Sequence, residues 1–240
     1  MASLLESAKD NLSFLGICLL VFLLLVGIAV AAERLTGLRH HRVSPPRYVS
    51  FIAMFSAIAA ILMFFEIPLF FAPSFYEIDL SELPVLICSF YLGPVAGVIC
   101  ELLKVLLKLL FKGTTTAFVG DFANFFVGCT MIIPASILYH AKKSKRSAIV
   151  GMIVGTAVMT VCGSAFNAIY LLPKFAELYG MPLDAIIGMG TQVNPYINNV
   201  STLVLMAVVP FNILKGIITS LLTFLLYKRV EKLLAPLSGK

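Results

Sequence analysis

The stretch FLGICLLVFLLLVGIAVAA, residues Phe14–Ala32, contains no charged residue and is long enough to cross a lipid bilayer as one helix. Inside hydrocarbon every backbone N–H and C=O group must be hydrogen-bonded within the protein, and a helix meets that need within a single segment. The run is too long for the core of a signal peptide, and the side chains of Glu6, Lys9 and Asp10 before it are not net positive. We therefore expect a retained N-terminal anchor helix.

The composition extends this conclusion to the whole chain. Of its 240 residues, 60% are hydrophobic and 12% are charged, whereas soluble domains carry about 25% charged residues. The strands of a membrane barrel would alternate polar and apolar residues, but here the apolar runs are continuous. The sequence therefore predicts an all-α, polytopic membrane helix bundle.

Six core transmembrane helices are expected after the N-terminal one. Gly93-Pro94 divides one run that is too long for a single helix, because proline breaks a helix interior. The runs that predict the core are Tyr48–Phe71, Val85–Gly113 (two helices), Thr114–His140, Ser147–Pro173 and roughly Ala207–Tyr227. We expect residues 1–46 to form the anchor helix and a basic loop, and residues 47–240 to form the six-helix core.

The net charge of +6 is concentrated in three short basic segments, Leu38–Arg47, Ala141–Arg146 and Tyr227–Lys232. Basic residues beside membrane spans favour the cytoplasmic side. Alternating the spans places all three segments on one side, so they are interpreted as cytoplasmic turns and not as a nucleic-acid surface. This topology predicts a multi-pass protein of the cell membrane with a cytoplasmic C-terminus and an anchor helix whose N-terminus lies outside.

Polar residues from several helices are expected at one depth. At about 1.5 Å per residue, Lys215 lies roughly 20 Å and Asn212 roughly 24 Å from the cytoplasmic end of the last helix. Asn167 and Asn124 lie at similar heights in their own helices. Lys112, Thr114, Thr115, Asp79 and Ser81 fall at outer helix ends or in an outer loop. A few polar groups on apolar walls are typical of small-molecule pockets, so we expect a binding site that faces outside.

Simpler roles are open for some of these residues. Lys215 could extend its ammonium to the headgroups, although Asn212 one turn away favours a paired site. Asn167 could join two helices by hydrogen bonding, and Tyr170 could either stack on a planar ligand or belong to the interfacial aromatic belt.

Two further patterns concern packing. Charged residues recur at helical spacing on one face and are expected to point into the bundle, with Glu101–Lys104 as the nearest pair and Lys112 at the mouth of the site; the four are Glu101, Lys104, Lys108 and Lys112. Small residues at helical spacing allow another helix to approach closely. We expect this at Ala53 and Ala57, against an internal or a partner helix, and within the protein at Gly151–Gly155.

The sequence lacks the motifs of several classes of enzyme. The sequence has no Walker A, GxSxG or HExxH pattern, and its cysteines and histidines form no metal-binding spacing. We therefore expect a binding protein that is not an enzyme, has no catalytic residues, metal or cofactor, and cannot pump alone. Two alternatives stay open: a membrane-embedded enzyme acting on a lipid-linked substrate through Asp79, Glu82 and Asp121, and a purely structural membrane subunit.

Six short motifs occur in an order that resembles a known family. They are DLSELP (Asp79–Pro84), GPVAG (Gly93–Gly97), FKGTTT (Phe111–Thr116), GDFANF (Gly120–Phe125), NAIYLLP (Asn167–Pro173) and PFNILKG (Pro210–Gly216). In this combination, over roughly residues 48–228, the chain resembles the riboflavin-specific S components, the substrate-binding membrane subunits of energy-coupling factor (ECF) transporters. The first 45 residues depart from the family pattern, which usually lacks an anchor helix.

The resemblance implies a vitamin pocket between helix ends, covered by the loop between the first two core spans. Riboflavin is then the transported ligand, and the partners are a transmembrane coupling subunit, two ABC-type ATPases and membrane lipid. Asn167, Asn212 and Lys215 match polar positions of the family, and so do Asp79, Ser81, Thr114 and Thr115. Ala53 and Ala57 would pack on the transmembrane partner. Another vitamin or the phosphorylated flavin FMN is the alternative ligand, because Lys112 and Lys215 would suit an anion.

Overall fold

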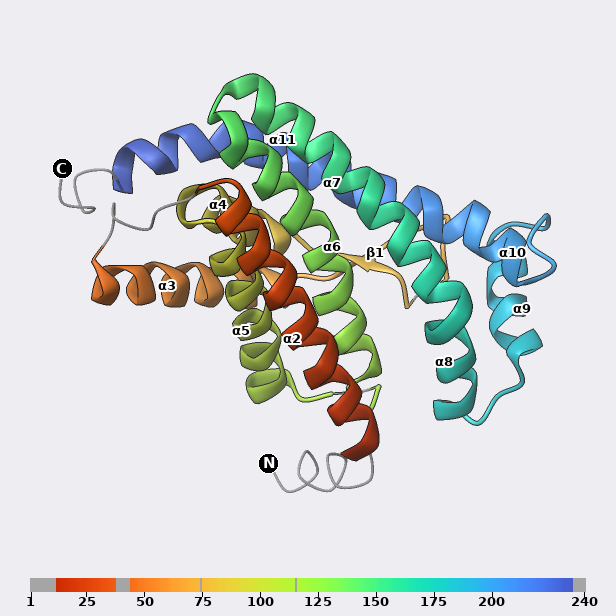
Figure 1. Cartoon of the computed structure of the whole chain (residues 1–240). Coiled ribbons are helices and arrows are strands. Elements are labelled where there is room, and N and C mark those ends of the chain that lie inside the picture. The colour runs from red at the N-terminus through yellow and green to blue at the C-terminus, as the bar shows by residue number, and fades with distance from the viewer. Residues whose placement is uncertain (1–11, 38–43, 74, 115, 235–240) are drawn as a thin grey trace.

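The computed structural model describes residues 12–37, 44–73, 75–114 and 116–234, and they form a helical bundle (Figure 1). The first helices are α2 (Leu12–Leu35), α3 (Pro45–Met63), α4 (Glu82–Leu92), α5 (Pro94–Lys112), α6 (Val119–Lys142) and α7 (Lys145–Phe166). The chain continues through the π-helix η1 (Asn167–Leu171), α8 (Leu172–Leu178), α9 (Leu183–Val193), α10 (Val200–Leu203), the π-helix η2 (Val204–Val208) and α11 (Val209–Leu234). Strands β1 (Ile67–Pro68) and β2 (Glu77–Ile78) form a short antiparallel pair between α3 and α4.

The predicted helical membrane bundle is confirmed. Among the described residues, five helices are long and apolar enough to cross a membrane. α4 is shorter, and α5 carries the charged stripe. The predicted break is also confirmed, because Gly93 has a φ of +116° between α4 and α5 and Pro94 begins α5. That backbone angle favours glycine.

Three expected helix boundaries were wrong. α3 ends at Met63 and not at Phe71. The backbone N–H groups of Phe64 and Phe65 donate to carbonyls three residues earlier, which ends the α-helical pattern, and the chain then enters β1, which contains Pro68. α6 begins at Val119 and not at Thr114, because Ala117 and Phe118 have positive φ angles. The last membrane-spanning segment, formed by α10, η2 and α11, begins at Val200 and not near Ala207, because Asn199 and Thr202 form a reciprocal cap there.

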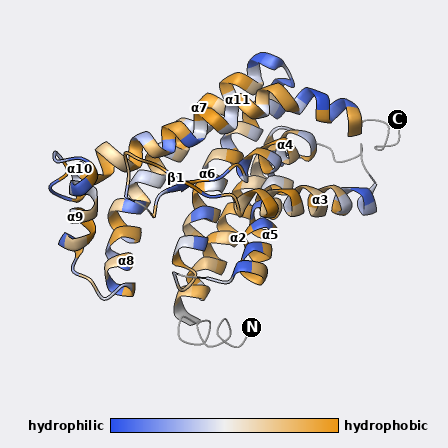
Figure 2. Cartoon of the chain, turned by 180° about the vertical axis from the view of Figure 1, so that it is seen from behind, coloured by the Kyte–Doolittle hydropathy of each residue, from blue (hydrophilic) through white to orange (hydrophobic). Residues whose placement is uncertain are grey.

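Hydrophilic residues mark the C-terminal end of α11, the start of α3 and the α6–α7 turn, and on the opposite side of the bundle they mark the region of α8, α9 and α10 (Figure 2). The α6–α7 turn, the C-terminal end of α11 and the start of α3 gather toward the upper left of Figure 1, while α9, α10 and the strands lie toward the right. These three ends belong to the segments that the sequence marks as basic. The arrangement fits the expectation that they share one side of a membrane.

Helix α2 contacts the core along α5 and α6. Its Glu33 carboxylate accepts a hydrogen bond of 3.0 Å from the backbone N–H of Val95, in the first turn of α5, where a helix has unsatisfied donors and favours negative charge. At the other end of α2, the ring of Phe14 packs against Phe122 and Tyr170. The division of the chain at residue 46 remains a prediction.

The glycines of α7 allow close contact with α6, as the sequence predicted. A Cβ on Gly155 would lie 2.5 Å from the backbone oxygen of Met131, and one on Gly151 would lie 2.6 Å from that of Ala135. Backbone atoms cannot rotate away as a side chain can, so the two helices would have to separate to admit a larger residue.

We expect Gly155→Ala to lower the free energy of unfolding by about 1–3 kcal/mol, the usual cost of overpacking. Gly188→Ala in α9 is the matched control, because a Cβ there meets no atom within 4 Å and alanine should gain roughly 0.5–1 kcal/mol through helix propensity. Thermal unfolding of both variants in detergent measures the difference. Equal stability of the two variants would contradict this account of the α6–α7 contact.

Candidate ligand-binding site

A cavity of about 140 Å³ lies among α6, η1, α11 and the segment that contains β2. Its polar lining includes Asn124 from α6, Asn167 from η1, and Asn212 and Lys215 from α11. These are four of the predicted ligand-binding residues, and the structure brings them together. The other lining residues are Phe75, Tyr76, Glu77, Gly120, Ala123, Val127, Leu171, Phe175 and Phe211.

Two π-helical segments lie beside the cavity. η1 begins with Asn167 itself, and η2 ends four residues before Asn212. The wider π turn adds a residue to a helical turn and is frequent at functional sites. The sequence carried no signal for either segment.

Two amide atoms at the cavity, Asn212 Nδ2 and Asn124 Oδ1, have no hydrogen-bond partner among the residues that the structure describes. Asn212 is 2% exposed, and buried polar groups in proteins nearly always have a partner. Asn167 differs, since its Oδ1 accepts a 2.7 Å hydrogen bond from the Tyr76 hydroxyl and its Nδ2 donates to the Gly163 carbonyl at 2.8 Å. A ligand with both donors and acceptors would satisfy the two free amide atoms.

Aromatic side chains close the cavity from the loop side. Tyr76 is buried and packs against Phe211 with 5.3 Å between ring centroids, while Phe75 lies 5.8 Å from Phe175. The loop therefore covers the cavity, as the resemblance implied. Tyr76, Phe75 and Phe211 were not predicted, because nothing in the sequence places an aromatic loop residue over a particular helix.

Lys215 is held by two carboxylates. Its ammonium lies 3.0 Å from Glu82 Oε1 and 3.3 Å from Asp79 Oδ2. Ser81 fixes both acids, because its N–H donates to Asp79 Oδ1 and its hydroxyl to Glu82 Oε2, each at 2.7 Å. Burial alone would raise the pKa of the Asp79 carboxyl, but Lys215, Lys104 and the Ser81 hydrogen bonds outweigh it and hold this pKa at about 2. Asp79 and Ser81 thus act on the cavity indirectly, by holding Lys215.

A second buried ion cluster lies next to this one. Lys104 pairs with Glu101 and lies 3.5 Å from Glu82 Oε2, and all three side chains are at most 1% exposed. One turn further on, Lys108 lies 2.5 Å from Asp121. The expectation that the charged stripe of α5 points into the bundle is therefore confirmed for its first three members.

Besides Asp79 and Ser81, three predicted site residues that the structure describes do not line the cavity. Lys112 pairs with Glu66, and the Thr114 hydroxyl donates to Asp121 at 2.8 Å. The Tyr170 ring stacks on Phe14 at 6.1 Å, and Thr115 lies outside the described residues. The predicted partner residues Ala53 and Ala57 are exposed on α3.

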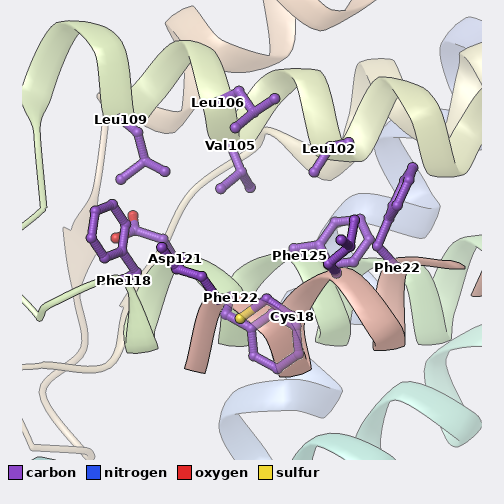
Figure 3. Close-up of a pocket in the computed structure, with 12 residues that line it drawn as sticks. Cys18, Phe22, Leu102, Val105, Leu106, Leu109, Phe118, Asp121, Phe122 and Phe125 are labelled. Atoms are coloured by element: carbon purple, nitrogen blue, oxygen red, sulfur yellow. The ribbon is translucent and has the colours of Figure 1, made fainter. Parts of the chain in front are cut away.

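A larger hollow, of about 330 Å³, lies between α2, α5 and α6 (Figure 3). Its walls are apolar side chains such as Phe22, Leu106 and Phe125, and within the described part of the chain Asp121 is the only carboxylate that lines it. That carboxylate already accepts from Lys108 and Thr114. Its described lining offers no amide or charged group without a partner, so the smaller polar cavity is the candidate site for a vitamin-like ligand.

A helix bundle with membrane-spanning helices and a small cavity of free amides under an aromatic cover defines a membrane-embedded small-molecule-binding protein. The family model described as "ECF transporter, substrate-specific component" matches residues 47–227. The chain therefore belongs to the S components of ECF transporters. This family binds substrates for transport and is not a family of enzymes, so the alternative of an enzyme for lipid-linked substrates is not favoured.

Individual relatives agree with this assignment. The "Riboflavin transporter RibU" of Staphylococcus aureus (strain TCH60) is 36% identical over 76% of this chain and 89% of its own. The "Riboflavin transporter FmnP" of Bacillus subtilis (strain 168) is 28% identical over 75% and 90%. A solved structure described as "Structure and mechanism of the S component of a bacterial ECF transporter" superposes with a TM-score of 0.63 at 36% identity, covering 80% of this chain and 99% of that one.

Proposed function

We propose that this chain captures riboflavin in the cavity of Asn124, Asn167, Asn212 and Lys215. The observation that carries the proposal is the pair of unpartnered amide atoms in a cavity whose other walls are largely apolar and aromatic. Riboflavin is planar and neutral, and its carbonyl groups, ring nitrogens and ribityl hydroxyls can meet the amides and the ammonium, while Phe and Leu side chains contact its rings. The printed names of the relatives support the same ligand.

The proposal includes the partners and the orientation. A transmembrane coupling subunit and two ABC-type ATPases on other chains would drive uptake. The exposed face of α3 with Ala53 and Ala57 would meet the coupling subunit, because small residues permit close helix contact. The basic helix ends and the C-terminus would lie in the cytoplasm, and the cavity would open to the outside.

The charges at the cavity favour the neutral vitamin over another ligand that carries a phosphate. Lys215 faces two carboxylates, and Lys112 pairs with Glu66. Neither ammonium is therefore free to neutralise an anion, as the alternative of FMN would require.

Titration of the purified, flavin-free protein with riboflavin tests this function. We expect saturable quenching of flavin fluorescence at one riboflavin per chain, and a yellow protein when the vitamin is not removed. Asn212→Ala should weaken binding by about 10- to 100-fold, since a buried unsatisfied polar group costs about 1–3 kcal/mol. Asn198→Ala, in an exposed turn, is the control and should bind as the parent does. Absence of saturable binding by the parent protein would refute the proposal.

A further inference from the structure

The cavity distinguishes riboflavin from FMN only if it recognises one group, the phosphate on the terminal ribityl hydroxyl. That phosphate adds about −1.5 to −2 charges at pH 7. The rest of the two molecules is the same, so the charges that surround the cavity can make it prefer one of them. This question rests on the proposed riboflavin binding.

Two charged residues line the cavity, Lys215 and Glu77. The first is neutralised by Asp79 and Glu82, at 3.3 and 3.0 Å. Glu77 is half-buried, and among the described residues its carboxylate forms no ion pair of its own; Lys112, which attracts it, pairs with Glu66. The charge that a ligand meets at this edge of the cavity is therefore negative.

The position of Glu77 is fixed by the short strand pair. Glu77 pairs with Pro68 in the register of β1 and β2, and Glu66 lies just before β1. The Lys112 ammonium at the end of α5 binds Glu66. The same ammonium also attracts the Glu77 carboxylate. One positive charge therefore serves two carboxylates beside the cavity, and an approaching phosphate meets a net negative charge there.

We propose that Glu77 is a specificity-determining residue that disfavours phosphorylated flavins, because its carboxylate and that of Glu66 have one ammonium between them and leave a net negative charge at the cavity edge on β2. Riboflavin carries no charge, so this carboxylate does not repel it. Two like charges repel more strongly next to a low-dielectric protein interior than they do in water. A single carboxylate can therefore make the affinity for FMN lower than the affinity for riboflavin.

The experiment compares the affinities of riboflavin and FMN for the parent protein and for Glu77→Gln, which keeps the size of the side chain. Burial and Glu66 raise the pKa of Glu77 while Lys112 lowers it, so titrations are made at about pH 8 to keep the carboxyl ionised. We expect the ratio Kd(FMN)/Kd(riboflavin) to fall about tenfold in Glu77→Gln, the result of removing about 1.4 kcal/mol of repulsion. Asp184→Asn, which removes an exposed carboxylate of α9 away from the cavity, should leave the ratio unchanged.

The outcomes separate this inference from the proposed function. If Glu77→Gln binds riboflavin but keeps the parent ratio, or if the parent binds both flavins equally, the role of Glu77 is wrong while flavin binding stands. If the parent binds neither flavin, the proposed function itself fails. Should Glu77→Gln not fold, the parent alone decides: added salt screens charge repulsion and should narrow the gap between the two affinities, and a gap independent of salt would overturn the role of Glu77.

Discussion

Replacing Lys215 with alanine should weaken riboflavin binding by at least about 100-fold, which corresponds to roughly 2.7 kcal/mol. The variant removes one proposed polar partner of the ligand and also the ammonium that lies between Asp79 and Glu82. Breaking a buried ion pair from one side typically costs about 3–5 kcal/mol, because the remaining charge is left without compensation. The loop that carries Tyr76 over the cavity should then lose its attachment to α11.

A second substitution separates the two effects. Adding Asp79→Asn to Lys215→Ala removes one stranded charge, so the double variant should regain thermal stability without regaining riboflavin affinity. If it binds riboflavin as tightly as the parent, Lys215 acts only by holding the loop and is not a ligand contact. Lys228→Ala is the surface control, since Lys228 pairs with Glu231 at about 40% exposure on both sides, and such pairs contribute about 0–1 kcal/mol.

The sequence predicts the helices and their polar residues well because membrane depth constrains both. A polar residue in hydrocarbon needs a partner, so Asn167, Asn212 and Lys215 could be placed at one level by counting residues along their helices. The Gly93-Pro94 break follows from the same kind of local rule. For these elements the chemistry of a few neighbouring residues decides the outcome.

The remainder of the site depends on contacts between distant segments. Tyr76 reaches Asn167 across 91 positions of sequence, and Lys215 reaches Asp79 across 136. No local pattern shows that two carboxylates converge on Lys215. From the sequence alone, the ammonium of Lys215 could therefore bind either a neutral flavin ring or a phosphate. The same limit explains Lys112 and Tyr170, whose chemistry suits a ligand but whose side chains contact Glu66 and Phe14 instead.

The buried ion cluster under the site should be the most sensitive part of the fold. We expect Lys104→Met to lower the free energy of unfolding by about 3–5 kcal/mol, because it leaves Glu101 buried without an ammonium and Glu82 with that of Lys215 alone. Methionine has a similar length and is apolar, so the loss measures charge and not a cavity. Thermal unfolding in detergent, followed by loss of the monodisperse protein, gives the shift relative to the parent.

The companion variants test whether charge is the cause. Glu101→Gln added to Lys104→Met removes the carboxylate that lost its ammonium and should recover part of the stability, because a neutral amide costs less to bury than a charge. Lys174→Met is the matched control, as Lys174 pairs with a carboxylate that is 69% exposed and its loss should cost at most about 1 kcal/mol. If Lys104→Met and Lys174→Met were equally stable, the ion cluster would not hold α4 and α5 together. Because Glu82 contacts both Lys104 and Lys215, damage to this cluster should also reach the ligand site, so riboflavin affinity should fall in Lys104→Met even in the fraction that remains folded.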